Sequence, residues 1–334
     1  MPSLLDMTKV PMTNILEQCD IKSVLILRKV CHDLRNFIND ANFKTDLNTI
    51  HIEFSERESS HAPEGNMKCC DVSLTFKSSF QCKRVTLNDL RILLNLQNSK
   101  LSSFMIRYGE EWDYINFVEV DHRESLLENS RYLDDLKDIL KNKPRPLQTE
   151  TIDLKVPRGL EVLKILPYLD SKVLKRITLM TPIVVRDTTN LDEIERIMEL
   201  EQFKMACELT IDGFSVDADL KKFFHFEKIC IKFQEIPIMD LVALKEAFTT
   251  SPHMEKFWLH HYIMDNDEFE KKFGVPSKET EPEDDFVGTI YKKWYFKMKT
   301  SKDDVLEINF ASFGLLSFKR IRAADVEENV IVRD

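Results

Sequence analysis

The first forty residues constrain the fold of this 334-residue chain most strongly, because they carry apolar residues on more than one side of the helices that they predict. A segment this short cannot build a self-sufficient hydrophobic core. One apolar stripe at helical spacing consists of Val24, Leu27, Cys31, Leu34 and Ile38. A second stripe consists of Ile26, Val30 and Phe37. The first stripe can close a small helical bundle, whereas the second needs another surface to cover it.

The segment 5–40 contains Ile15-Leu16, Asp20, Val24-Leu25 and the run Leu27-Arg28-Lys29-Val30-Cys31-His32-Asp33-Leu34-Arg35. Through these residues it resembles an F-box, the helical module that docks on a Skp-type adaptor of cullin ubiquitin ligases. The spacing from the early Ile-Leu pair to the Val-Cys pair is that of the family.

Two positions of this module depart from the family pattern. Thr8 stands where many F-boxes have proline, and Cys19 stands where a leucine is usual. Threonine can cap the start of a helix, and cysteine packs as a small hydrophobic residue. Pro11 is expected in the first helical turn, where proline is tolerated. Both departures are therefore compatible with the fold of the module.

The resemblance implies an adaptor contact made through an apolar helix-on-helix interface. The residues expected to make it are Met7, Val10, Met12, Ile15, Leu16, Val24, Leu25, Leu27, Val30, Cys31 and Leu34. Some of these side chains must also close the module internally, since a helical bundle of this size has few other apolar residues to bury.

The charge of the chain disfavours a dedicated nucleic-acid binder. The formal net charge is -10 and the pI is near 5.4, whereas binding phosphate requires concentrated Lys and Arg. Residues 292–299 combine lysines with aromatic residues, which can stack on bases. Their strict alternation instead predicts a half-buried edge strand. With only 7 glycines, the chain also carries no G-x-G-x-x-G or Walker-type phosphate loop.

The cysteines indicate reduced thiols. There are seven, scattered along the chain with no C-x-x-C spacing: Cys19, Cys31, Cys69, Cys70, Cys82, Cys207 and Cys230. This pattern is typical of an intracellular protein, cytoplasmic or nuclear, rather than of a disulfide framework or a zinc site. We also expect no signal peptide and no membrane span, because the basic n-region and the long apolar run are both lacking.

Beyond the N-terminal module, apolar periodicity predicts a mixture of strands and helices. Strands are expected at 49–54, 70–76, 103–107, 150–156, 174–179, 208–212, 228–233, 254–259, 291–299 and 304–310. Helices are expected at 87–96, 129–141, 160–169, 191–207 and 239–249. The first two strands predict an antiparallel hairpin, and the last two predict another.

The succession of helix and strand from residue 149 is typical of a leucine-rich-repeat-like solenoid, although the strict repeat motif is absent. The predicted fold class is α+β, with a three-helix F-box followed by an irregular, leucine-rich-repeat-like curved α/β sheet. Helical crossovers imply mostly parallel strands in this region. The expected domains are 1–42 for the F-box, 43–148 for a first α/β part, and 149–334 for the repeat-like part with its C-terminal hairpin.

Three segments of the region 149–262 are informative together, and they lie at 163–170, 200–209 and 224–226. Through these segments the region resembles the FOG-type homology (FTH) domain that follows the F-box in a large nematode family. The combined resemblance implies an F-box substrate-receptor subunit that bridges an adaptor–cullin ubiquitin ligase to a protein target. An alternative is a non-degradative interaction module that binds a regulatory protein, for example an RNA-binding one.

No set of residues predicts catalysis, and no cofactor or metal is expected. His260 and His261 point to opposite faces of a strand, so they are poorly placed to share a metal. His225 lies between two phenylalanines, which favours a packed, hydrogen-bonded side chain. Ubiquitin transfer is left to other subunits. The target-binding surface is not identified by the sequence, and its aromatic candidates are Trp112, Tyr114, Trp258 and Tyr262.

Overall fold

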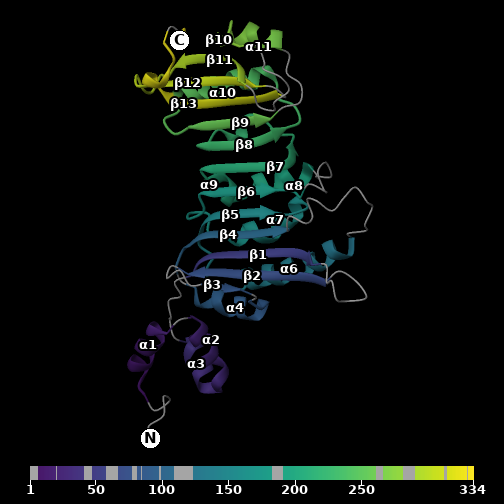
Figure 1. Cartoon of the computed structure of the whole chain (residues 1–334), viewed down its shortest axis with the longest axis vertical. Helices are drawn as coiled ribbons and strands as arrows, with labels where there is room; N and C mark the ends of the chain where they lie inside the picture. The colour runs from purple at the N-terminus through teal and green to yellow at the C-terminus, as the bar shows by residue number, and fades with distance from the viewer. Residues whose placement is uncertain are drawn as a thin grey trace. The chain divides into compact units, whose positions relative to one another are not determined.

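The computed structural model describes residues 7–19, 21–40, 47–57, 67–76, 81–83, 85–97, 99–108, 123–182, 191–260, 266–280, 290–311, 314–328 and 330–334. The protein is mixed α/β (Figure 1). It divides into two compact units: residues 1–152 with 164–173, and residues 153–163 with 174–334.

The first unit begins with three helices, α1 (Lys9–Gln18), α2 (Ile21–Val30) and α3 (His32–Asp40). The buried apolar side chains of these helices are those of Met12, Leu16, Val24, Leu34 and Ile38. Pro11 lies in the first turn of α1, as predicted. Thr8 is the N-cap residue of α1, but its side chain makes no capping hydrogen bond. The predicted N-cap position of Thr8 is therefore confirmed, whereas a capping hydrogen bond to its hydroxyl is not observed.

A four-stranded arrangement follows in the first unit, in the order β4-β1-β2-β3. The strands are β1 (Leu47–Arg57), β2 (Met67–Phe76), β3 (Gln81–Lys83) and β4 (Leu101–Tyr108), and the helices are α4 (Leu87–Leu96) and α6 (Arg123–Lys141). The antiparallel pairing of β1 with β2 confirms the predicted hairpin. Thr86 caps α4, since its hydroxyl accepts a hydrogen bond of 3.1 Å from the Asp89 amide.

The chain passes from one unit to the other through β5 (Thr149–Lys155), α7 (Gly159–Ile165) and the short 3-10 helix η2 (Leu166–Tyr168). In the second unit the strand order is β10-β11-β12-β13-β9-β8-β7-β6, and β14 pairs with β11. The strands are β6 (Arg176–Met180), β7 (Glu208–Val216), β8 (Lys228–Phe233), β9 (Lys256–His260), β10 (Lys278–Glu279), β11 (Ile290–Lys297), β12 (Asp304–Ala311), β13 (Leu315–Arg322) and β14 (Val332–Arg333). β6 to β9 are parallel, as predicted, and β9, β13, β12 and β11 pair antiparallel.

The helices of the second unit are α8 (Leu191–Met198), α9 (Glu201–Met205), α10 (Ile238–Thr250) and α11 (Asn266–Phe273), with 3-10 helices η4 (Leu220–Phe223) and η6 (Ala323–Asp325). In Figure 1 α10 lies behind the strands, which leaves the other face of the sheet toward the viewer. Phe248 of α10 packs on Phe257 and Phe318, with ring centroids 5.1 and 6.0 Å apart. One face of β9 and β13 is therefore covered by α10.

The single helix predicted at 191–207 is wrong, because the chain breaks into α8 and α9 at Leu200, whose backbone is extended. Ile194 and Phe203 are both buried, at 4% and 2% exposure. At about 100° per residue, an unbroken helix would put these two side chains on opposite faces. The break allows both to enter the same core.

The strand predicted at 291–299 is confirmed as β11, but its predicted position at the edge of the sheet is wrong. β11 lies between β10 and β12, and it also pairs with β14. Trp294, Tyr295 and Phe296 are all buried, so the strict alternation of exposure expected at an edge is lost. The helix α11 and the strand β13 were not predicted. α11 covers this part of the core through Phe269, whose ring lies 4.9 Å from that of Trp294.

Gly213 is expected to be intolerant of substitution. It lies at an irregularity of β7, where pairing with β8 jumps from Ile211 to Ser215, and its φ is +82°. An added Cβ would overlap the hydroxyl of Thr181. Gly213→Ala should lower the free energy of unfolding by about 1–3 kcal/mol from the backbone conformation alone, with the overlap adding to it. Gly274→Ala is the control in urea denaturation, because Gly274 has φ +80° and more open surroundings. Equal losses at the two glycines would refute the steric part of this prediction.

Candidate functional site

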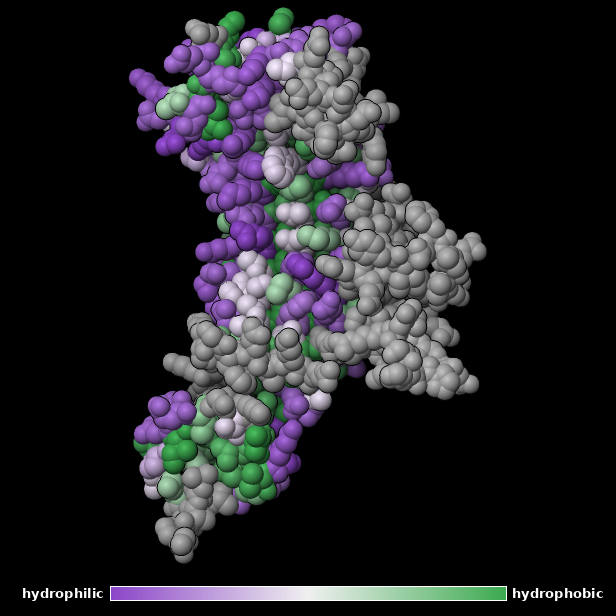
Figure 2. All heavy atoms as spheres, viewed as in Figure 1, coloured by the Kyte–Doolittle hydropathy of each residue, from purple (hydrophilic) through white to green (hydrophobic). Residues whose placement is uncertain are grey.

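The helices α1 and α2 expose large apolar side chains. Val10 is 69% exposed on α1, while Ile26 and Val30 are 54% and 63% exposed on α2. Ile26 and Val30 are four residues apart and therefore share one face of α2. That face lies opposite Val24, which is fully buried. Figure 2 shows apolar residues gathered on the surface of these N-terminal helices.

The predicted adaptor-contact residues fall into three groups by exposure. Exposed ones are Met7, Val10 and Val30, half-buried ones are Ile15, Leu25, Leu27 and Cys31, and buried ones are Met12, Leu16, Val24 and Leu34. The buried group closes the module, and the exposed group is free to meet a second surface. Ile26 is exposed but was not among the predicted contacts. The second apolar stripe, to which Ile26 belongs, was the signal that could have included it.

The turn between α2 and α3 sets the position of the exposed face. Cys31 separates the two helices, and its Sγ accepts a hydrogen bond of 3.5 Å from the Leu34 amide. Arg35 of α3 donates through Nε to the carbonyl oxygen of Arg28 at 3.2 Å. Burial lowers the pKa of Arg28, and the charge of Arg35 lowers it further. These contacts tie the last turn of α2, which carries Val30, to the first turn of α3.

The rim of this exposed face is charged and polar. Lys29, His32 and Asp33 are exposed next to Val30. The Nδ1 atom of His32 lies 3.1 Å from the side-chain nitrogen Nδ2 of Asn36. An apolar centre with a polar rim is the usual composition of a protein–protein interface. We call Met7, Val10, Ile26 and Val30 together the apolar face of the module.

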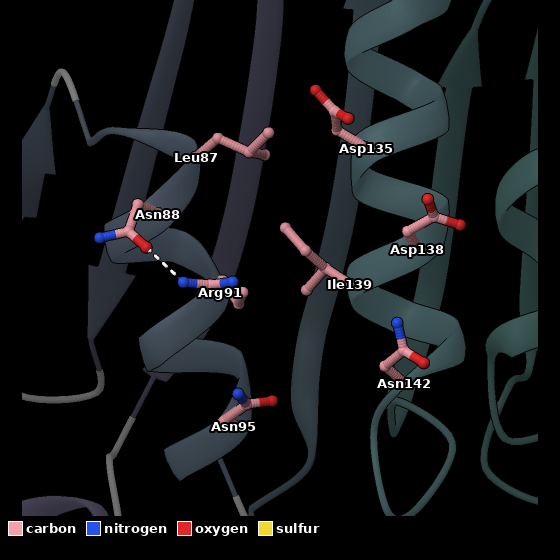
Figure 3. Close-up of a pocket in the computed structure, with 8 residues that line it drawn as sticks. All are labelled: Leu87, Asn88, Arg91, Asn95, Asp135, Asp138, Ile139 and Asn142. Carbon is pink, nitrogen blue, oxygen red and sulfur yellow. Dashed lines mark hydrogen bonds between the residues drawn. The ribbon is translucent and has the colours of Figure 1, made fainter.

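A polar groove lies between α4 and α6 in the first unit. It encloses about 560 Å³, and its lining residues are Leu87, Asn88, Arg91, Asn95, Asp135, Asp138, Ile139 and Asn142. Figure 3 shows Arg91 donating to Asn88 on α4, at 2.7 Å, with Asp135 and Asp138 on α6 across the groove. The lining holds no Ser, Cys or His, so it offers no hydroxyl, thiol or imidazole nucleophile of these kinds.

Lys143 lies just beyond α6 and donates its Nζ proton to the carbonyl oxygen of Leu94 in α4. Burial lowers the pKa of Lys143 from 10.5 to about 8. Between these pH values the unfolded chain binds more protons than the folded chain, so the contribution of this site to stability rises with pH. Lys143→Met should abolish that rise. The difference in unfolding free energy between wild type and variant, measured in urea at pH 7.5 and 10, should then shift in favour of wild type at pH 10. If the difference in unfolding free energy between wild type and Lys143→Met were the same at pH 7.5 and pH 10, the prediction would be wrong.

The histidines are not assembled into a metal or catalytic site within the described residues. No group of three or more His, Cys, Asp or Glu side chains able to hold a metal ion occurs there. His260 is exposed on β9, whereas His261 lies outside the described residues. His225 packs on Phe226, with ring centroids 4.0 Å apart, and bonds to the Phe203 carbonyl at 3.1 Å. This contact confirms the predicted packed and hydrogen-bonded histidine.

Of the aromatic candidates for target binding, only Trp258 lies in the described part of the chain. It is 42% exposed on β9. Trp112, Tyr114 and Tyr262 fall outside that part. In the same described residues, no helix is both long enough and apolar enough to cross a bilayer.

Comparison with known protein families identifies two domains. The F-box domain matches residues 4–46, which contain α1, α2 and α3 with the apolar face. The FTH domain matches residues 130–277, from within α6 to the segment after α11. No curated protein and no solved structure matches the chain. The chain is an F-box protein with an FTH domain.

Proposed function

We propose that this protein is the substrate-receptor subunit of a cullin ubiquitin ligase, held in the complex by a Skp-type adaptor. F-box domains in general bind such adaptors and serve as substrate receptors. The observation that carries the proposal is the apolar face, where Val10, Ile26 and Val30 are more than half exposed on a module whose own core is already closed. Covering one such side chain contributes about 1.5–3 kcal/mol, so this face favours a bound partner.

The exposure pattern supports a narrower set of proposed adaptor contacts. We assign the direct contact to the apolar face together with the half-buried Leu27 and Cys31. Met12, Leu16, Val24 and Leu34 support that face from within the module. The three helices α1, α2 and α3 form the adaptor-binding domain, at about residues 1–42.

The remainder of the chain holds the target in this proposal. Residues 43–148 form its first part, and residues 149–334 form a leucine-rich-repeat-like part with the C-terminal strands. In the latter, α8 and α9, η4, and α10 connect the parallel strands β6, β7, β8 and β9 in turn. Holding the target beside the ubiquitin-loaded enzyme raises its effective concentration there. The receptor itself is non-catalytic, and ubiquitin is transferred by other subunits.

The test is copurification with a purified Skp-type adaptor, comparing the intact chain with a chain that lacks the first 40 residues. We expect only the intact chain to retain the adaptor. Addition of the cullin and a ubiquitin-loaded enzyme should then ubiquitinate the receptor itself, which reports assembly without knowledge of the target. Retention of the adaptor by both forms, or by neither, would refute the proposed role of the module.

A further inference from the structure

Three lysines from three neighbouring strands lie in one row on the sheet of the second unit. Lys228 of β8 is the register partner of Lys256 of β9, and Lys256 is the partner of Lys319 of β13. We call these three residues the lysine row. Adjacent strands are about 4.8 Å apart, and like charges directly opposite one another are destabilising. The fold itself thus gains nothing from this arrangement.

The charges of the row are incompletely neutralised. Lys228 pairs with Glu208 at 3.1 Å and with Glu255 at 3.2 Å. Among the described residues, no ion pair forms at Lys256 or Lys319. The Lys256 ammonium lies 3.7 Å from the centroid of the Trp258 ring, a cation–π contact. Burial lowers the pKa of Lys256, and the charges of Lys319 and Lys228 lower it further.

The lysine row lines a hollow of about 590 Å³ at one end of these strands. Arg320 lines the same hollow and is held in place by its own hydrogen bonds, at 2.8 Å to the Pro252 carbonyl and also to the Ser251 carbonyl. Its Nε is buried without a hydrogen-bond partner among the described residues. The hollow therefore presents five cations, from the lysine row, Arg320 and Arg322, against the three carboxylates of Glu227, Glu255 and Asp304.

The same face carries an exposed aromatic residue beside the row. Residues two apart in a strand share a face, so Trp258 lies on the face of Lys256, away from the face that α10 covers. The register partners of Trp258 are Cys230 on β8 and Ser317 on β13. Figure 2, which views this side of the sheet, shows weakly polar and apolar residues along the middle of the strands and polar ones beside them.

Carboxylates flank the lysine row on both sides, and they limit the length of a ligand that the row can bind. Glu208 of β7 is the partner of Lys228, and Glu307 of β12 is the partner of Lys319. The positive strip is thus three strands wide, or about 10 Å between its outer lysines. A nucleic acid would extend its phosphates past the strip toward these carboxylates. A short run of acidic side chains fits within it.

We propose that the lysine row and Trp258 bind a short acidic segment of a partner protein, with its carboxylates on the lysines and an apolar residue against the tryptophan. That the partner is the ligase target rests on the proposed function, whereas the binding itself does not. The chain is acidic overall, with net charge -10. At physiological salt, charges farther than about 8 Å are largely screened, so the local row determines attraction.

The test is fluorescence anisotropy of the full chain with a fluorescein-labelled peptide that has three glutamates on each side of one leucine. The lysine-row variant combines Lys256→Ala with Lys319→Ala. The control combines Lys271→Ala with Lys272→Ala, which removes the same charge from two exposed lysines of α11. We expect the lysine-row variant to weaken peptide binding about tenfold or more, at about 1.4 kcal/mol per factor of ten, and the control to leave it unchanged.

Thermal unfolding separates a lost contact from a damaged fold. Because the row opposes like charges, the lysine-row variant should be at least as stable as wild type while binding the peptide less well. Lys319→Ala alone, which leaves the Lys256–Trp258 contact in place, should weaken binding in the same direction.

Three results would overturn the inference. They are no peptide binding by wild type, equal binding by the lysine-row variant and wild type, and tighter binding of a labelled oligouridylate than of the peptide, which would make the surface an RNA site. Adaptor copurification is measured in parallel. Peptide binding without adaptor binding would refute the proposed function alone, and the reverse would refute this inference alone.

Discussion

Val30→Asp should abolish binding of the Skp-type adaptor while leaving the thermal unfolding midpoint of the chain unchanged. The Val30 side chain is 63% exposed, so an aspartate there stays hydrated in the free protein. In the complex the same carboxylate would be buried against an apolar surface without a partner. That penalty amounts to several kcal/mol, which corresponds to a loss of affinity of about 100-fold or more. Isothermal titration calorimetry with the purified adaptor measures it.

Ile331→Asp provides a matched control for this result. Ile331 is 66% exposed and lies in the second unit, so the change is of the same kind at a similar exposure but outside the module. It should leave adaptor affinity unchanged. Leu25→Asp would be a poorer test, because Leu25 is half-buried and its replacement can unfold the module. Undiminished adaptor binding by Val30→Asp would remove the apolar face from the proposed interface.

Truncation after Thr280, close to the end of the FTH match, should prevent the second unit from folding. The removed segment contains β11, β12 and β13, and β13 is the antiparallel partner of β9. It also contributes the buried side chains of Trp294, Phe296, Leu306, Ile308, Leu316 and Phe318. Loss of one such large side chain already costs about 2–5 kcal/mol, and a domain is stable by only about 5–15 kcal/mol.

Truncation after Arg322 is the comparison for this prediction. It removes η6 and the two-residue strand β14 but keeps every strand from β6 to β13. Urea denaturation followed by circular dichroism should show a cooperative transition for the chain that ends at Arg322. In the chain that ends at Thr280, the second unit should show no such transition. A folded, cooperative protein ending at Thr280 would show that the FTH match is a complete structural domain.

The sequence predicted most strands of this protein well, because each carries its own alternation. The parallel strands β6 to β9 and the hairpin of β11 with β12 were anticipated from local patterns. α11, with its short run of Asn266–Phe273, carries too few apolar positions to stand out. The break at Leu200 was missed because it depends on burying Phe203 in a core made by other elements.

The surfaces were harder to predict than the elements. The two apolar stripes put Val24 and Val30 on different sides of the helix, yet the predicted adaptor contacts included both residues. The structure shows that Val24 is buried and Val30 is exposed. The lysine row has no local signal at all. Its members are at positions 228, 256 and 319, and only the pairing of β13 with β9 places the third beside the others.

The two-residue strands at the far end of the second unit bear on how the protein behaves at high concentration. β10 and β14 each cover only part of β11, pairing with it at two residues apiece. Short outer strands leave little continuous backbone on which the sheet of another molecule could extend itself. Terminal repeats of solenoids have the same effect of ending the stack. We therefore expect light scattering of the concentrated protein to show no polymers that grow by extension of the sheet from this end.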